Sequence, residues 1–214
     1  MPEQQSARQL GSKGRKTRDA IEQSARKLFA ESGFHGTTLA DITSAAGKSP
    51  AVFYRYFTDK EDLLAALAQS FLHDVVTPSG LSLHLPDSPQ DDAFFTAVVT
   101  GYWNMFKQNI GVMIAVAQLA ATQQRFADVQ TQFRRFGMSI VAASVRRAQE
   151  QGYGTELNPD HTAAAIALLF ENFTTVFVGR SGAEGLLSGI TDQEAITTLA
   201  TVWKKTLYGD MSKV

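Results

Sequence analysis

The sequence predicts an all-α protein, in which a small N-terminal unit of three helices precedes a larger helical body. Apolar residues recur at helical spacing along most of the chain, as Ile21, Ala25, Leu28 and Phe29 do near its start. Residue pairs typical of helix starts, such as Ser-Pro and Asn-Pro, precede several of these segments. No segment shows the sustained alternation expected of a β-strand. Together these observations predict about nine helices and no sheet.

Three helices separated by glycines make up the predicted N-terminal unit. Gly33 ends the first, since glycine readily takes the left-handed conformation of a C-cap. Thr37 or Thr38 caps the second helix, which ends before a turn at Gly47. Ser49-Pro50 opens the third, because proline has no N–H to leave unpaired at the first helical position.

Six more helices are predicted in the body, together with two irregular segments. Capping boxes at residues 58–61 and 191–194 open the first and last of the six. Residues 77–90 contain several prolines and are expected to form a linker, and residues 179–189 are expected to form a glycine-rich loop. The apolar positions that support the six helices are Leu63, Leu67 and Phe71; Phe94, Val98 and Tyr102; Ile110–Ala121; Val129, Phe133 and Ile140; Ile166, Phe170 and Phe177; and Ile196, Leu199 and Trp203.

Residues 37–60 have the layout of a helix-turn-helix, in which one helix crosses the DNA backbone and the next lies in the major groove. Tyrosine hydroxyls suit phosphates, and Arg55 suits either a guanine edge or a phosphate. The charge distribution also favours DNA binding by this unit. Residues 1–60 carry ten Lys and Arg and six Asp and Glu, whereas residues 61–214 carry ten Lys and Arg and fifteen Asp and Glu. The residues predicted to contact DNA are Thr37, Thr38, Lys48, Ser49, Pro50, Ala51, Tyr54, Arg55, Tyr56 and Lys60.

The segment from Arg18 to Leu64 resembles the TetR family of transcriptional regulators. Lys48 and Thr43 depart from the family's usual residues, and a lysine in the turn remains compatible with phosphate contact. The matching residues are Arg18, Ile21, Ala25, Phe29, Gly33, Phe34, Thr37, Thr38, Leu39, Ile42, Ala46, Gly47, Ser49, Phe53, Tyr54, Tyr56, Phe57, Lys60, Glu61 and Leu64. The resemblance implies DNA contacts by Thr38, Ser49, Tyr54, Tyr56 and Lys60.

The resemblance also implies a domain plan and partners. It predicts a helix-turn-helix DNA-binding domain over 17–60 and a helical ligand-binding and dimerisation domain over 61–214, while the basic and polar composition of residues 1–16 predicts a disordered tail. The tail either stays solvated or reaches DNA as a basic arm. The expected protein is a cytoplasmic homodimer on a palindromic operator in double-stranded DNA, a repressor released by a small-molecule effector. The alternative is a regulator whose body responds to a protein partner.

The body is rich in aromatic residues and methionine, which line apolar ligand sites but more often simply form a core. A mostly apolar effector is therefore expected, although Glu171 leaves a cationic one open. The residues predicted to contact it are Tyr102, Trp103, Phe106, Met113, Phe133, Phe136, Asn172 and Phe173.

Apolar stripes on the last two long helices predict a four-helix dimer interface. The residues assigned to it are Phe170, Phe177, Ile196, Leu199 and Trp203. The alternative is that these stripes close the core of a single chain.

The sequence offers little support for an enzyme. It contains no Cys, its four His show no metal-binding spacing, and it has no GxSxG elbow or phosphate-binding glycine loop. No catalytic residue, metal or cofactor is therefore predicted. The polar N-terminus and the lack of an uncharged apolar run of about 18 residues predict a cytoplasmic protein with no membrane segment.

Overall fold

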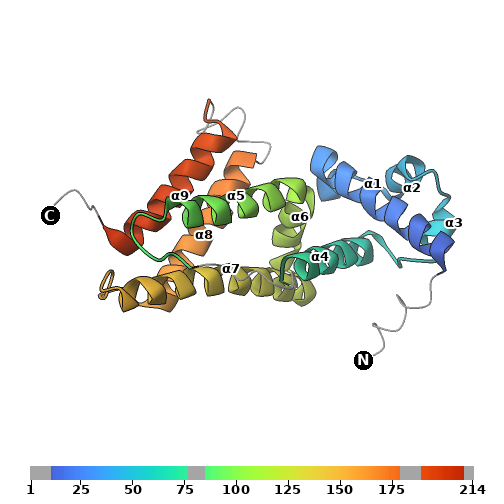
Figure 1. The fold of residues 1–214 in the computed structure, drawn as a ribbon. Coiled ribbons are helices and arrows are strands. Elements are labelled where there is room, and N and C mark those ends of the chain that lie inside the picture. Colours follow the sequence, from blue (N-terminus) through green and yellow to red (C-terminus); the bar gives the residue numbers. More distant parts are fainter. Residues whose placement is uncertain (1–10, 77–84, 179–188, 210–214) are drawn as a thin grey trace. The chain divides into compact units, whose positions relative to one another are not determined.

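The computed structural model describes residues 11–76, 85–178 and 189–209, and these form nine helices and no strand (Figure 1). The prediction of an all-α fold is thus confirmed. The chain divides into two compact units. The first comprises residues 1–73 and 111–129, and the second comprises residues 74–110 and 130–214. The predicted linker and glycine-rich loop lie largely outside the described residues.

The first unit is built on the helix-turn-helix. It contains α1 (Ser12–Gly36), α2 (Leu39–Ala45), α3 (Pro50–Phe53), most of α4 (Lys60–Val76), nearly all of α6 (Ile110–Ala120) and the start of α7 (Gln124–Glu150). Its core joins the apolar faces of all these elements. The fully buried members include Ile21, Ala25, Ile42, Phe53, Leu63, Leu64, Leu67 and Phe126.

Contacts far apart in the sequence change the predicted domain boundaries. The helix-turn-helix does not form a unit by itself over residues 17–60, because α4 and α6 complete its core. Gly111 allows α6 to approach α1 closely: a Cβ there would lie 2.4 Å from the carbonyl carbon of Phe29. Any side chain at this position would hold the two helices apart.

Two helix starts also differ from the prediction. Helix α1 begins at Ser12, so residues 12–16 are helical and not part of a disordered tail. Residues 1–10 lie outside the described residues. Helix α4 is capped by Asp59, whose Oδ1 accepts a hydrogen bond from the Asp62 amide at 2.7 Å, and not by Thr58. In turn the Thr58 amide donates to Asp62 Oδ2 at 2.8 Å. The same polar sequence offers two cap registers, and the structure adopts the second.

The second unit contains α5 (Asp92–Gln108), the rest of α7, α8 (Pro159–Val178) and α9 (Asp192–Tyr208). Trp203 of α9 stands at its centre, where its ring meets Phe94, Phe95 and Phe170 edge-on at 5.2 to 6.1 Å between centroids. The Trp203 indole Nε1 donates to the Ser144 hydroxyl on α7 at 3.2 Å. The core of this unit is therefore aromatic and includes a satisfied polar pair.

The residues predicted to form the dimer interface belong to this core. Ile196, Leu199 and Trp203 are at most 5% exposed, and Phe170 is 7% exposed. Phe177 is half-buried, and its ring lies 5.0 Å from that of Trp103. The alternative interpretation therefore holds for these stripes, which close the core of a single chain. The outer faces of α8 and α9 carry a different set of apolar residues.

Candidate DNA-binding surface and ligand site

Local capping sets the geometry of the helix-turn-helix. Thr38 and Asp41 form a reciprocal capping box at the start of α2, with the Asp41 amide donating to Thr38 Oγ1 at 3.1 Å and the Thr38 amide donating to Asp41 Oδ2 at 2.8 Å. Hydrogen bonds from Thr38 hold the Asp41 pKa below its usual value. Gly47 turns the chain with a φ of 62°, and Ser49 caps α3. These short-range bonds fix the direction of α3 with respect to α2.

Helix α3 and the turn after it present an exposed polar face over a buried aromatic base. Phe53 is fully buried and Phe57 nearly so, whereas the neighbouring Tyr54 is 61% exposed. The core does not need the Tyr54 ring, because Phe53 and Phe57 already fill the space beneath α3. The exposed residues among the predicted DNA contacts are Thr38, Ser49, Pro50, Ala51, Tyr54 and Arg55, and the half-buried ones are Lys48, Tyr56 and Lys60.

Thr37 does not belong to this face. Its side chain is 1% exposed, and its hydroxyl donates to the carbonyls of Gly33 and Leu28 at 2.8 and 3.2 Å. The physical reason is the bend at Gly33 (φ 73°) near the end of α1. After this bend the Thr37 side chain lies against α1 and bonds its carbonyls. The predicted DNA contact by the Thr37 side chain is therefore wrong.

Lys60 has a structural role that the sequence did not indicate. Its ammonium group donates to the carbonyl oxygens of Phe34 and Thr37 at 2.6 and 2.7 Å. It also lies 4.3 Å from the centre of the Phe34 ring. Partial burial lowers the Lys60 pKa. Two of its three protons thus serve the end of α1, which leaves one for a phosphate.

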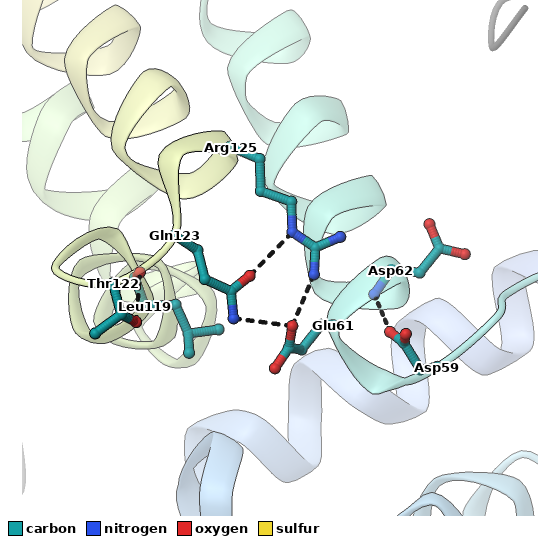
Figure 2. A network of polar contacts seen from close by, with 7 residues as sticks. All are labelled: Asp59, Glu61, Asp62, Leu119, Thr122, Gln123 and Arg125. Carbon is teal, nitrogen blue, oxygen red and sulfur yellow. Dashed lines mark hydrogen bonds and ion pairs between the residues drawn. The ribbon is translucent and has the colours of Figure 1, made fainter.

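A polar cluster links α4 to the turn after α6 and to the first turn of α7 within the first unit, and Figure 2 shows it closely. Glu61 Oε2 accepts hydrogen bonds from Gln123 Nε2 at 2.9 Å and from Arg125 Nη2 at 2.8 Å. Arg125 Nε also donates to Gln123 Oε1 at 3.2 Å. We call these three residues the Glu61 clasp. No local signal reveals it, because its partners lie more than sixty residues apart in the sequence.

The predicted ligand residues do not all come together. Asn172 is exposed, and its amide donates to the Leu168 carbonyl of its own helix at 2.9 Å, so it does not point into the second unit. Met113 belongs to the first unit. Phe133 and Phe136 are half-buried on α7. Helical spacing alone could not assign a face to Asn172, and the place of Met113 depends on the packing of α6 against the distant α1.

Four of the predicted ligand residues do meet in the second unit, at the boundary of α5 and α8. Trp103 and Phe106 are at most 1% exposed, and Tyr102 packs on Phe106 with their ring centres 5.8 Å apart. Phe173 of α8 stacks on Phe177 at 6.1 Å, and Phe177 meets Trp103. This aromatic boundary is the part of the prediction that the structure assembles.

Glu171 already has a cationic partner. Arg134 of α7 donates to its two carboxylate oxygens at 2.6 and 2.8 Å, and Gln130 adds a third bond at 3.2 Å. This bidentate pairing raises the Arg134 pKa, as expected for a guanidinium held by a carboxylate. A cationic effector was considered because Glu171 is an isolated charge in an apolar helix. Its pairing with Arg134 removes this argument.

Comparison with known proteins places this architecture in a family. Residues 21–67, which cover α2, α3, the greater part of α1 and the first half of α4, match the sequence profile of bacterial regulatory proteins of the tetR family. The chain carries the DNA-binding segment of the TetR family. It is therefore a DNA-binding transcriptional regulator with a helix-turn-helix followed by a helical C-terminal region.

Relatives with assigned names extend the likeness beyond the DNA-binding segment. The regulator EthR of Mycobacterium tuberculosis is 26% identical over 89% of this chain and 87% of its own length. The regulator UidR of Escherichia coli K12 is also 26% identical, over 74% of this chain and 78% of its own.

Solved structures of other transcriptional regulators share the fold. A putative regulator from Rhodococcus sp. superposes with a TM-score of 0.67 at 20% identity, covering 89% of this chain and 98% of the other. FadR from Bacillus subtilis, solved in complex with stearoyl-CoA, gives a TM-score of 0.63 at 16% identity, covering 89% of this chain and 97% of the other. At these identities the likeness establishes the fold alone.

Proposed function

We propose that this protein is a repressor that leaves a palindromic operator when a small, mostly apolar molecule binds its second unit. The observation that carries the proposal is the pairing of an exposed polar α3 face with an aromatic α5–α8 boundary in another unit of the same chain. FadR of Bacillus subtilis was solved with stearoyl-CoA, and the apolar acyl chain of that ligand supports an effector with a large apolar part in a protein of this fold. A regulator that acts on DNA also belongs in the cytoplasm.

The proposed DNA surface consists of the residues that the structure leaves exposed or half-exposed around α3. Ser49, Pro50 and Ala51 are short enough for the backbone of α3 to approach the bases. Tyr54 and Tyr56 offer hydroxyls to phosphates, and Arg55 offers a guanidinium to a guanine or a phosphate. Lys48, Thr38 and the remaining Lys60 proton complete the set.

The proposed signal runs through α6. The chain passes from α5, which carries Tyr102 and Trp103, to α6 through Asn109 alone. Within the first unit, α6 packs on α1 at Gly111, and the turn that follows α6 holds α4 through the Glu61 clasp. A ligand that changes the position of the end of α5 would thus act on both helices that support α3. The change is a shift between two populated states, and the ligand must bind one of them better.

The proposed dimer uses the outer faces of α8 and α9. Leu168, Leu169 and Val176 on α8 and Val202 on α9 are 40 to 48% exposed. The hydroxyls of Thr198 and Thr206 donate to their own helix at 2.8 Å, which favours a non-polar α9 face around Val202. A dimer would place two α3 helices about 34–36 Å apart or at a multiple of this distance, in successive major grooves.

Helix α8 also has a feature that the dimer would explain. It is the one helix among the described residues that is long and apolar enough to cross a membrane, a test that helices of water-soluble proteins also pass. Only 22% of its apolar window is buried within the chain. Pairing with a second copy would cover the remainder.

A screen followed by operator release tests the ligand response. Neutral apolar and cationic compounds would first be ranked by thermal shift, and hits would then be added to the protein bound to DNA. We expect neutral hits to lower operator affinity about a hundredfold, which corresponds to a coupling of about 2.7 kcal/mol. Operator DNA should weaken binding of the same compound by the same factor. If no compound changes operator affinity and a protein partner does, the small-molecule proposal is wrong.

A further inference from the structure

Among the five buried side-chain polar atoms without a hydrogen-bond partner in the described residues, three lie on α5 and α8. They are the hydroxyl of Tyr102, the indole Nε1 of Trp103 and the hydroxyl of Thr174. The side chains of Trp103 and Thr174 are fully buried. The other tryptophan offers a direct comparison, because Trp203 Nε1 is equally buried but donates to Ser144. The core of this unit thus satisfies one indole and leaves the other without an acceptor.

The three groups lie at one boundary, where α5 meets α8. The Tyr102 ring lies 5.9 Å from Phe170, and the Trp103 ring lies 5.0 Å from Phe177. Thr174 falls between Phe170 and Phe177 on the same face of α8, at helical spacings of four and three residues. The Tyr102 hydroxyl is close enough to Thr174 for their interaction to affect its pKa, although no hydrogen bond of ordinary geometry joins them.

An unpartnered buried polar group is costly, and most buried polar groups in proteins have a partner. An indole N–H can only donate, so Trp103 requires an acceptor. A hydroxyl can donate or accept, so Tyr102 and Thr174 can complete the coordination of one oxygen atom. Aromatic rings surround these polar atoms, since Phe106, Phe170 and Phe177 contact Tyr102 or Trp103. The combination of apolar walls and a few polar groups is typical of a small-molecule site.

The charges nearby favour a neutral molecule. Burial raises the Tyr102 pKa, and the negative charge of Glu171 raises it further, so the phenol keeps its proton at neutral pH. Glu171 is itself paired with Arg134. An added cation or anion would therefore meet no opposite charge from these groups and would lose its hydration.

We propose that Tyr102, Trp103 and Thr174 form the polar end of the effector site and bind an uncharged, largely aromatic or aliphatic molecule through a carbonyl oxygen that accepts the Trp103 Nε1 proton. This inference rests on the proposed function and deepens it, because it states the chemical class of the effector. It also explains why a core that pairs Trp203 leaves Trp103 unpaired.

A matched pair of fluorescent molecules tests the proposal on the full-length protein. Prodan is a neutral naphthalene with a propionyl carbonyl, and its emission shifts to longer wavelength when that carbonyl accepts a hydrogen bond. 2-(Dimethylamino)naphthalene lacks the propionyl group. We expect prodan to bind more tightly. The substitutions Tyr102→Phe, Trp103→Phe and Thr174→Val should each weaken prodan binding about five- to tenfold and leave the second molecule within about twofold. Trp103→Phe should also remove the emission shift.

Thermal unfolding without ligand provides a second, independent measurement. Tyr102→Phe and Thr174→Val each remove an unpartnered hydroxyl and keep the shape of the side chain, so the Tm should stay the same or rise. Ser144→Ala is the control: it leaves Trp203 Nε1 without its acceptor, so it should lower the Tm and leave the preference for prodan unchanged.

Several results would overturn the proposal. One is equal binding of both molecules by the wild type. Another is a prodan affinity that Trp103→Phe does not change, which would mean that no ligand carbonyl accepts the Trp103 Nε1 proton. Failure of both molecules to bind would also overturn it, even if another compound released the operator and so supported the proposed function. If prodan bound as expected but the protein bound no DNA, the proposed function would fail and the site would stand.

Discussion

Lys60 shows at the scale of one residue how a side chain assigned to DNA also holds the fold. Its ammonium group bonds the carbonyls of Phe34 and Thr37 where α1 ends, and the Phe34 carbonyl also accepts a hydrogen bond from the Thr37 amide at 3.4 Å. We predict that Lys60→Ala lowers the free energy of unfolding by about 1–2 kcal/mol, since charge-assisted hydrogen bonds are lost at a partly exposed site. Chemical denaturation measures this.

The DNA role of Lys60 needs a separate measurement and a control. Lys27→Ala removes an equal charge from the same unit, at a side chain that is 75% exposed. At a temperature where both variants are folded, Lys60→Ala should lower DNA affinity more and reduce the salt slope by about one. Unfolding curves that coincide for the two variants would contradict the structural role, and equal salt slopes would contradict the phosphate contact.

Neighbouring threonines show where prediction from sequence stops at this scale. Thr37 and Thr38 are equally good caps by residue type, and only Thr38 caps α2 while Thr37 is buried. The bend at Gly33 and the contact with Leu28 decide between them, and neither is visible in local propensity. Asn172 is similar, because its amide bonds its own helix and not the interior.

At the scale of elements, the close approach of α6 to α1 makes Gly111 a sensitive position. We predict that Gly111→Ala lowers the free energy of unfolding by about 1–3 kcal/mol, because its Cβ would meet the backbone of Phe29 and Ala30 at 2.4 Å. Gly101→Ala in α5 is the matched control. A Cβ there meets nothing within 4 Å, so the protein should gain about 0.5–1 kcal/mol. Urea unfolding of both variants measures the difference. Equal stabilities would contradict the prediction, because they would show that α6 can move away from α1 with no loss of free energy of unfolding.

The Glu61 clasp provides a prediction about coupling between elements (Figure 2). Glu61 and Arg125 are 39% and 46% exposed, so Glu61→Gln should change stability by less than about 1 kcal/mol. We expect it to reduce the factor by which an effector lowers operator affinity, because α4 is then held less firmly to the turn after α6. Arg146→Ala removes another exposed ion pair, to Asp160, and is the control. An unchanged factor in Glu61→Gln would exclude the clasp from the signal.

The elements themselves were predictable because their starts carry strong local signals. The Thr191–Glu194 capping box and Pro50 at the start of α3 appear in the structure as the sequence predicted. The place of α6 was not predictable, since it depends on Gly111 meeting α1 about eighty residues earlier in the chain. The two compact units therefore differ from a single body over residues 61–214 at α4 and α6, although both helices were expected.

For the whole molecule, the burial of the predicted interface moves the proposed dimer to the opposite faces of α8 and α9. We predict that Val202→Glu gives a folded monomer with weak DNA affinity, because it places a charge on an exposed apolar face. Trp203→Glu, one residue further, should unfold the protein, since it buries a charge in an aromatic core. Sedimentation combined with circular dichroism separates the two results. A Val202→Glu variant that sediments as the wild type does would exclude this face.

The class of the whole molecule could be predicted from the sequence, whereas its assembly could not. The aromatic run from Phe53 to Phe57 and the turn at Gly47 indicate a DNA-binding unit because the chemistry is local. A dimer interface depends on which of two apolar faces the chain covers by itself. On α9 both faces carry apolar residues, namely Trp203 and Val202, and only the packed structure shows which one is left exposed.

Selection of DNA from a random duplex library tests the central claim most directly. The wild-type protein would be used at physiological salt, beside Arg55→Ala and an Arg146→Ala control. The account predicts enrichment of one palindromic sequence bound by an even number of chains, with affinity that falls steeply as salt rises. Arg55→Ala should weaken or relax this selection, and Arg146→Ala should not. Recovery of no sequence above the random background, with the protein folded, would contradict the account.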